Sequence, residues 1–487
     1  MPYACYREIP WAINLILSRF SNTNGVSGRI RSVDRRSESG GRRLKTNIKE
    51  IRDPIHNFIH VDRDEVELID SRPFQRLRHI HQLALTHLVY PAASHKRFEH
   101  SLGVMELAGR AFDAITDREN VDEQARALFP KITQSGFLGY WRKVLRIAAL
   151  CHDLGHPPYS HAAEKELFPH KFTHEKMTRF IIESDELNAI WRKMTPRPMP
   201  EDIVKVALGP KDVSDLEFND WELVLAEIIT GNSLGVDRMD YLLRDSYHLG
   251  VGYGKFDHFR LLETLRIVVP PPVTKPSLIQ TELPIGTEKS EEKSTEPALG
   301  LLIGGIHSAE ALLLARYFMF AQVYYHPVRM AYDYHLMDFL KAWLPSGTLP
   351  TDYEEHLVLT DNEVNTAIRE AASDASKPGH KAAERILQRM HFKLLRQFTP
   401  DELTHDPLLP SRITNELKNK FGANRIHAYD RAEKKSPKRF AVRMKDGRTE
   451  SSIAVSQVLR SYPTLNFSLI LIDPDLKQLA LEFLKKS

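Results

Sequence analysis

The chain has 487 residues, of which 42% are hydrophobic and 27% charged, and its 67 Lys and Arg nearly balance its 64 Asp and Glu. This composition is typical of a globular protein with a large core, and the net charge of +3 argues against a surface that coats nucleic acid. The only cysteines, Cys5 and Cys151, exclude a disulfide framework and favour a reducing, cytoplasmic location. Because no apolar run approaches the roughly 20 residues that cross a bilayer, we expect a soluble protein without a membrane partner.

Residues 1–43 differ from the rest of the chain. Residues 21–28 are rich in Ser, Asn and Gly, and residues 29–43 repeat arginine with few apolar residues between. We interpret residues 1–43 as a disordered basic tail. A nucleic-acid-binding arm is the alternative interpretation of the same arginines.

Helical periodicity dominates residues 64–265 and returns over 308–344, which predicts a helical core over residues 44–345. Within it, residues 270–300 contain a proline run and then a polar, charged stretch, which indicates a hairpin with a long loop or an insertion. The predicted helices cover residues 64–83, 97–117, 141–155, 172–192, 221–231, 237–247 and 308–344.

The last part of the chain, residues 346–487, mixes helical and strand-like patterns. Thr360 and Glu363 have the spacing of a capping box at the start of a helix. A short strand over 440–444 precedes the turn-forming pair Asp446-Gly447, and a second apolar strand covers 467–472. We therefore predict a mainly α protein, with a helical core and a small α+β C-terminal region.

The strongest chemical signal lies in residues 148–161, Ala-Ala-Leu-Cys-His-Asp-Leu-Gly-His-Pro-Pro-Tyr-Ser-His. An apolar helix runs into His152 and Asp153, and His156 and His161 follow within ten residues. Burying an imidazole and a carboxylate at a helix end is costly unless a partner such as a divalent cation satisfies them. A core hydrogen bond between one histidine and one aspartate is the plain alternative for any single pair.

Matching ligands elsewhere weaken that alternative. His100 begins an otherwise apolar helix, and Asp237, Tyr241 and Asp245 form a polar stripe at helical spacing. His100, His152, Asp153 and Asp237 make a set of two histidines and two carboxylates. Such a set suits one divalent ion per site, which would be Mn, Fe, Mg, Ni or Zn.

The order His, then His-Asp, then Asp resembles the signature of the HD-domain superfamily. Five segments resemble its dNTP triphosphohydrolase branch, which contains bacterial dGTPases and a vertebrate enzyme with a sterile-alpha-motif domain. The resemblance spans roughly residues 48–345 and implies a metal-dependent hydrolase that releases a deoxynucleoside and triphosphate. We expect no sterile-alpha-motif domain in the N-terminal tail. The five segments are Phe-Gln-Arg-Leu-Arg (74–78), Arg-Phe-Glu-His-Ser-Leu-Gly-Val (97–104), Cys-His-Asp-Leu-Gly-His (151–156), Asp-Arg-Met-Asp-Tyr-Leu-Leu-Arg-Asp (237–245) and Tyr-His-Leu-Gly (247–250).

The resemblance also implies roles for individual residues. His100, His152, Asp153 and Asp237 match the metal ligands. His161 matches the catalytic acid, which the carboxylate of Glu164 would orient. Around the phosphates and the sugar, the matching positions are His156, His174, Gln82, Leu83, Arg97, Arg238, Tyr241, Asp245, Arg316 and Tyr324. For His174 a surface position at a helix start is the alternative, and for each arginine a surface ion pair.

Regulation and assembly follow only from the resemblance. Asp70, Gln75 and Arg78 match positions at which relatives bind an activating guanine nucleotide between subunits, although a solvated helix face has the same spacing. The resemblance also implies a homo-oligomer, a tetramer in relatives. Tyr325 stands where some relatives have a glutamine near the base, so the base preference is open.

Two other functions remain open at this point. An HD phosphohydrolase for another ester, such as a nucleoside monophosphate, a cyclic nucleotide or an alarmone, would need fewer cationic contacts than a triphosphate. A nucleic-acid-binding or scaffold protein with a vestigial metal site would fit the arginine-rich tail, but the intact ligand set argues against it.

Overall fold

The computed structural model describes residues 48–162, 164–169, 171–270, 296–432, 439–463 and 466–486, without the side chains of His161, Lys165, Arg431, Ala432 and Asn466. Its contacts divide the chain between Lys45 and Thr46, and all described residues belong to the second unit. The predicted tail, residues 1–43, lies outside the described residues, as do residues 271–295 of the predicted insertion. No helix of the described residues combines the length and apolarity needed to cross a membrane.

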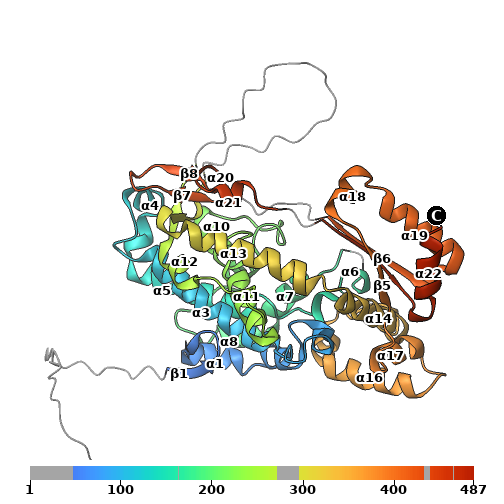
Figure 1. Ribbon diagram of the computed structural model, residues 1–487. Helices are drawn as coiled ribbons and strands as arrows, with labels where there is room; N and C mark the ends of the chain where they lie inside the picture. Colours follow the sequence, from blue (N-terminus) through green and yellow to red (C-terminus); the bar gives the residue numbers. More distant parts are fainter. Residues whose placement is uncertain are drawn as a thin grey trace, which may run out of the picture. The chain divides into compact units, whose positions relative to one another are not determined.

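The fold is mainly α, as predicted, and two long helices form its centre (Figure 1). Helix α3 (Arg97–Thr116) is buried along most of its length and packs against α5 (Ser135–Cys151). Helices α9 (Pro200–Leu208), α10 (Asp220–Thr230) and α11 (Val236–Leu249) surround this pair. The predicted helices 97–117, 221–231 and 237–247 are thereby confirmed.

Three predicted helices are interrupted where proline or a capping side chain favours extended backbone. Residues 64–83 form α1 (Arg63–Ile69), α2 (Arg72–Arg76) and a 3-10 turn, because Ser71 is extended and proline follows at the start of α2. Residues 172–192 divide into α7 (His174–Ile182) and α8 (Asp185–Trp191), since Ser184 caps the second helix.

The predicted helix 308–344 contains α13 (Ile306–Met319), a π-helical turn (Phe320–Tyr324) and α14 (Pro327–Trp343). Pro327 cannot donate a backbone hydrogen bond and therefore starts a new helix. The predicted helix 141–155 instead spans Ser135–Cys151, so His152 and Asp153 lie in the turn that follows it.

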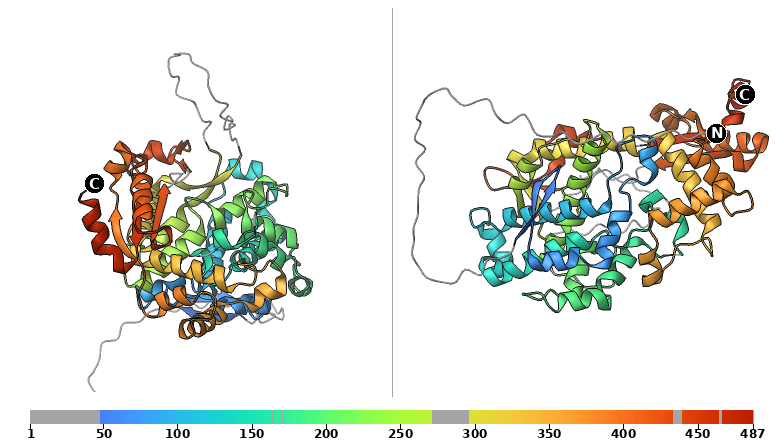
Figure 2. Two further views of the ribbon diagram at one scale, coloured as in Figure 1. Left: turned by 90° about the vertical axis from the view of Figure 1, so that its right-hand side faces the viewer. Right: turned by 90° about the horizontal axis from the view of Figure 1, so that it is seen from below.

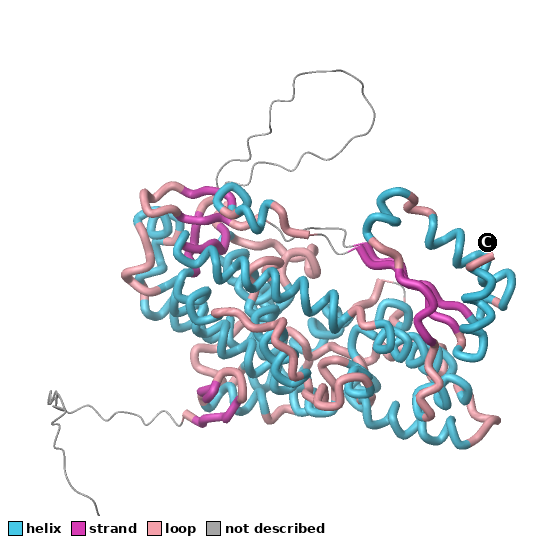
Figure 3. Tube along the Cα trace, in the orientation of Figure 1, coloured by secondary structure: helices cyan, strands magenta, loops and turns pink. Residues whose placement is uncertain are grey.

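The strands lie in three separate groups (Figure 3). A hairpin pairs β1 (Lys49–Asp53) with β2 (Asn57–Val61). A second sheet has the order β3-β4-β7-β8, built from Leu265–Val268, Ala298–Leu302, Ala441–Arg443 and Thr449–Ser451. The antiparallel pair β7–β8 turns at Gly447, whose φ of 85° suits glycine, so the predicted hairpin is confirmed. The predicted strand 467–472 is also confirmed.

That strand, β9 (Asn466–Ile472), is the centre of the third sheet, β5-β9-β6, with β5 (Lys393–Gln397) and β6 (Ile426–Ala432). Helix α22 (Lys477–Leu484) lies against this sheet (Figure 2, left). Helix α16 (Asp361–Ser373) begins with the predicted capping box of Thr360 and Glu363. The other α-helices of the described residues are α4 (Glu123–Leu128), α6 (Glu164–Leu167), α12 (His258–Thr264), α15 (Tyr353–Val358), α17 (His380–Leu387), α18 (Pro400–His405), α19 (Leu409–Phe421), α20 (Ser452–Val455) and α21 (Gln457–Arg460).

Candidate metal centre and active site

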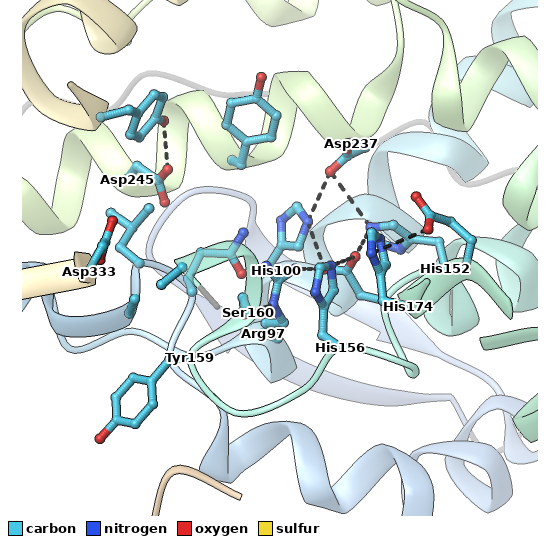
Figure 4. A pocket seen from close by; sticks show the side chains of 18 of the residues that line it. Arg97, His100, His152, His156, Tyr159, Ser160, His174, Asp237, Asp245 and Asp333 are labelled. Atoms are coloured by element: carbon cyan, nitrogen blue, oxygen red, sulfur yellow. Dashed lines mark hydrogen bonds and ion pairs between the residues drawn. The ribbon is translucent and has the colours of Figure 1, made fainter. Parts of the chain in front are cut away.

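The four predicted metal ligands come together from three elements, and three of them, His100, His152 and Asp237, are labelled in Figure 4. His100 lies in the first turn of α3, His152 and Asp153 follow α5, and Asp237 lies in the first turn of α11. Asp237 Oδ1 is 3.1 Å from His100 Nε2 and 3.6 Å from His152 Nε2. Asp153 Oδ1 is 3.4 Å from His152 Nε2, so both carboxylates face the two imidazoles.

The hydrogen bonds of the two imidazoles show which atoms face the centre. His152 Nδ1–H donates to the Ala149 carbonyl at 2.7 Å, and His100 Nδ1–H donates to Asp240 Oδ2 at 2.8 Å. Each ring therefore turns its Nε2 towards the carboxylates, and His152 Nε2 is buried without a hydrogen-bond partner in the described structure.

A cation would satisfy this arrangement. Burial disfavours a charged His100, but Asp237 and Asp240 outweigh burial and raise its pKa to about 10. The same site therefore attracts positive charge strongly, and nitrogen and carboxylate donors in this number fit a divalent transition metal or Mg²⁺. The ligand atoms of His100, His152 and Asp237 all lie within 4.8 Å of one another.

A buried network holds His100 from behind. Asp240 is fully buried and also contacts His56 Nε2 at 2.6 Å through Oδ1. Arg244 donates to both Asp240 oxygens, at 2.8 and 2.9 Å, and to Asp53 at 2.8 Å. Such carboxylate partners fix the orientation of a metal-binding histidine, so Asp240 supports the ligand set. Asp240 lies within the motif of residues 237–245, but its place in the sequence alone indicated no role for it.

A second group of ionisable side chains lies beside the metal centre. The rings of His156 and His174 stack with centroids 3.9 Å apart. Glu164 Oε1 accepts from His174 Nδ1–H at 2.5 Å and from its backbone N–H at 3.1 Å. Burial lowers the pKa of His174, but the Glu164 carboxylate outweighs burial and raises it overall. Burial and the nearby Arg97 charge lower the pKa of His156.

The structure thus joins Glu164 to His174, whereas the family resemblance implies that Glu164 orients His161. Residues 160–162 form a 3-10 turn, which places the His161 backbone next to the cavity residue Ser160. The His161 side chain lies outside the described part of the structure, so its pairing with Glu164 stays a prediction.

Arg97 connects the metal centre to the turn that precedes His161. Its guanidinium is buried, forms a short ion pair with Asp153 through Nη1, and donates from Nε to Ser160 Oγ at 2.6 Å. Arg97 also lines the cavity. A positive group in this place can bind a phosphate oxygen next to the metal ligands.

One cavity of about 670 Å³ extends from these groups to a second cluster (Figure 4). Tyr324 O–H donates to Asp245 Oδ2 at 2.7 Å, and His95 Nε2 contacts Asp245 Oδ1 at 2.7 Å. Tyr241 lies edge-on to Tyr324, with ring centroids 6.4 Å apart. The cavity is also lined by Gln82 and Leu83, as well as by Arg329, Asp333 and Tyr429, which the sequence analysis did not single out.

Two predicted phosphate contacts are not among the residues that line this cavity in the described structure. Arg238 Nη1–H is 3.5 Å from the Gly231 carbonyl. Arg316 lies over the Phe320 ring, 4.7 Å from its centroid. Their roles stay predictions. Arg329 and Asp333 lie one helical turn apart on α14. This spacing of two charged residues could have indicated that they share one face of the helix, the face that lines the cavity.

The predicted regulatory residues lie on the first interrupted helix. Asp70 and Arg78 are exposed, and Gln75 is half-buried. Gln75 Nε2–H donates to the Ile69 carbonyl at 2.7 Å, and Arg78 Nε–H donates to Gln75 Oε1 at 2.8 Å. They form a polar surface outside the cavity, and its proposed ligand stays a prediction.

Comparison with known proteins identifies the family that shares this architecture. A family model described as the HD domain matches residues 97–245, and one described as the HD associated region matches residues 291–419. The crystal structure of a hypothetical protein from Aquifex aeolicus is 30% identical and aligns with a TM-score of 0.70 over 90% of this chain and 100% of its own. The chain belongs to the HD superfamily of metal-dependent phosphohydrolases.

Within that superfamily the chain falls in the branch that resembles dNTP triphosphohydrolases. Deoxynucleoside triphosphate triphosphohydrolase SAMHD1 of Homo sapiens is 35% identical over 244 residues, which are 45% of this chain and 36% of SAMHD1. YwfO, an uncharacterised protein of Bacillus subtilis, is 34% identical over 284 residues, 58% of this chain and 52% of its own. The match thus spans half of YwfO and little more than a third of SAMHD1.

Proposed function

We propose that the protein hydrolyses deoxynucleoside triphosphates at the α-phosphorus and releases a deoxynucleoside and triphosphate. The observation that carries this proposal is the single cavity that joins two clusters. One end holds His100, His152 and Asp237, and the other holds the buried pair Tyr324–Asp245. A nucleotide has the same polarity, with phosphates at one end and a sugar at the other.

His100, His152, Asp153 and Asp237 would hold the divalent cation, which when bound supplies a Lewis acid that polarises a phosphate and activates water. The protein's own groups would do the rest. Arg97 would bind a phosphate oxygen, because it lines the cavity and its guanidinium pairs with Asp153.

Histidines would supply the remaining charge and the proton. The Glu164 carboxylate raises the pKa of His174, whose ring stacks on His156, so this pair would offer hydrogen-bond donors beside the phosphates. His161 would protonate the leaving 5′-oxygen, the role that the family resemblance gives it.

At the other end of the cavity, the sugar would meet Tyr241, Tyr324 and Asp245. Asp245 would accept a hydrogen bond from the 3′-hydroxyl, and its position is fixed by Tyr324 and His95. An aromatic ring against the 2′-carbon leaves no room for a ribose hydroxyl, so we expect deoxyribonucleotides to be favoured. Gln82 and Leu83 would complete this wall.

Product analysis tests the proposal. The purified protein is incubated with all four dNTPs and with Mn²⁺ or Mg²⁺. Two variants are treated in the same way: Asp153→Ala, and Glu370→Ala as a control at an exposed residue of α16. Chromatography should show deoxynucleosides and triphosphate with the wild type and with Glu370→Ala, and none with Asp153→Ala. Absence of dNTP turnover with every metal would refute the proposal, and nucleoside monophosphates, cyclic nucleotides and alarmones would be tested next.

Regulation is a separate proposal. We infer that a guanine nucleotide binds to the surface of Asp70, Gln75 and Arg78 and that this binding accompanies homo-oligomer formation. Turnover of dATP should then rise when GTP is added, and size-exclusion chromatography with light scattering should show a larger species. Full dATP turnover without any guanine nucleotide would contradict this inference.

A further inference from the structure

The turn before His161 has an unusual backbone. Tyr159 and Ser160 are consecutive non-glycine residues with φ of 55° each. Two neighbouring side chains in the left-handed region are disfavoured, so the surrounding structure must hold them there. Ser160 in turn accepts the Arg97 hydrogen bond at 2.6 Å, and the strained turn therefore sets the place of a cavity group. We call residues 156–162 the histidine loop.

The group that holds this turn comes from a distant part of the chain. Asp361, the first residue of α16, is 1% exposed. Its Oδ1 accepts the Tyr159 backbone N–H at 2.7 Å. Its Oδ2 accepts the His81 backbone N–H at 2.7 Å and the His81 Nδ1–H at 2.5 Å. Asp361 therefore joins the histidine loop to the segment that continues into Gln82 and Leu83.

These contacts are not those of a helix cap. Thr360 is the N-cap of α16, and its hydroxyl and Glu363 satisfy the first turn. The three hydrogen bonds of Asp361 all go to segments outside its own helix. Lys96 Nζ completes the arrangement, because it donates to His81 Nε2 at 2.6 Å and leaves Nδ1–H for Asp361.

A second bridge runs parallel to the first. Arg76 is 4% exposed and donates from Nη1 to the His156 carbonyl and from Nη2 to the Leu359 carbonyl, both at 2.8 Å. Burial lowers the pKa of Arg76 to about 10, and the Asp361 charge opposes that shift. Hydrogen bonds thus link both ends of the stretch 156–159 to residues 359–361. His156 is linked through Arg76, and Tyr159 is linked directly to Asp361.

We propose that Asp361 is a positioning residue for the reaction, which holds the histidine loop against the segment 81–83 through the Tyr159 and His81 backbone amides. The expected effect on kcat rests on the proposed function. The expected effect on the position of the histidine loop does not. Asp361 itself does not line the cavity, so it acts through the groups that do.

The test compares Asp361→Asn with Thr360→Ala. Asparagine keeps the size of the side chain, but its amide NH₂ cannot accept a backbone N–H, so the contact with either Tyr159 or His81 is lost. Thr360→Ala removes the cap of the same helix and touches neither loop, and it therefore reports the effect of weakening α16 alone.

Two readouts are measured for wild type and both variants: steady-state kinetics with a dNTP, and hydrogen exchange of peptides covering 156–162, with melting temperatures alongside. For Asp361→Asn we expect kcat to fall by at least about tenfold with KM nearly unchanged, because a small misplacement of reacting groups has such effects. Exchange in the histidine loop should rise. Thr360→Ala should keep the wild-type kcat and the wild-type exchange of the histidine loop, even if its melting temperature falls as far as that of Asp361→Asn.

Wild-type exchange of the histidine loop in Asp361→Asn would overturn the inference, as would wild-type kcat in that variant. An equal loss of kcat in Thr360→Ala would also overturn it, since α16 stability alone would then explain the effect. If the wild type hydrolyses no dNTP, the proposed function fails, while loop exchange still decides whether Asp361 positions the loop.

Discussion

Gly103 lies on α3 less than one turn after His100, at the point where α3 meets the network behind the metal centre. A Cβ at this position would be 1.9 Å from Asp240 Oδ1 and 2.5 Å from Arg244 Nη2. Neither group can retreat easily, because both side chains are fully buried and bonded to each other. Gly103→Ala therefore has to displace the carboxylate that orients His100.

Three terms set the expected size of the effect. Breaking one hydrogen bond of the charged Asp240 costs about 1.5–3 kcal/mol. Crowding in a rigid core adds about 1–3 kcal/mol. Alanine in a helix regains only about 0.5–1 kcal/mol over glycine. We expect Gly103→Ala to lower the free energy of unfolding by about 2–5 kcal/mol, and to weaken metal binding by about 10–100-fold through the misplaced His100.

Urea unfolding of the metal-free protein and metal titration measured by elemental analysis check these values. Gly139→Ala on α5 is the matched control, because Gly139 is exposed and a Cβ there meets no atom within 4 Å. The control should be stabilised slightly, by about 0.5–1 kcal/mol. If Gly103→Ala unfolds at the urea concentration of the wild type and binds metal as tightly, the packing argument is wrong.

Two further predictions concern other parts of the molecule. His335 Nε2 accepts the Phe392 backbone N–H at 3.0 Å, and burial lowers the pKa of His335 to about 3 from 6.5. Between pH 6.5 and about 3 only the unfolded chain binds this proton, so the free energy of unfolding should fall as the pH drops through this range. The urea midpoint should fall less steeply with pH in His335→Gln, which lacks this group. Tyr324→Phe removes a buried donor to Asp245, which should cost about 1–3 kcal/mol and raise KM for a dNTP roughly tenfold. An unchanged KM and unchanged discrimination against the ribonucleotide would argue against the sugar-binding role.

The clustering of the candidate metal ligands could be predicted because each lies in a short segment with its own pattern. His152 and Asp153 interrupt an apolar helix, and His100 and Asp237 each lie in the first turn of another. The structure brings these atoms within a few ångströms, as the pattern indicated. The helices that lack internal breaks were also predicted well, because the 3.6-residue period continues through them.

Side-chain bridges between distant segments could not be predicted in this way. Asp361 and His81 are 280 positions apart in sequence, and Asp361 and Tyr159 are 202 apart. No local period links such residues, and Asp361 lies between Thr360 and Glu363, the two residues of the predicted capping box. The interruptions at Ser71 and Pro327 were missed for a different reason: apolar periodicity continues across them, although the backbone hydrogen bonding does not.

The path of the chain between two sheets has a consequence for synthesis. After β6 the chain leaves the third sheet, forms β7 and β8 beside β4, and returns as β9 between β5 and β6. The central strand, β9, is therefore the last of the three strands of that sheet to leave the ribosome. The strands β5 and β6 emerge earlier, with unpaired edges that favour aggregation. A chain stopped before residue 466 would keep those edges exposed, and one stopped before β7 would also uncover β4. Shortened versions of this protein should therefore retain β9.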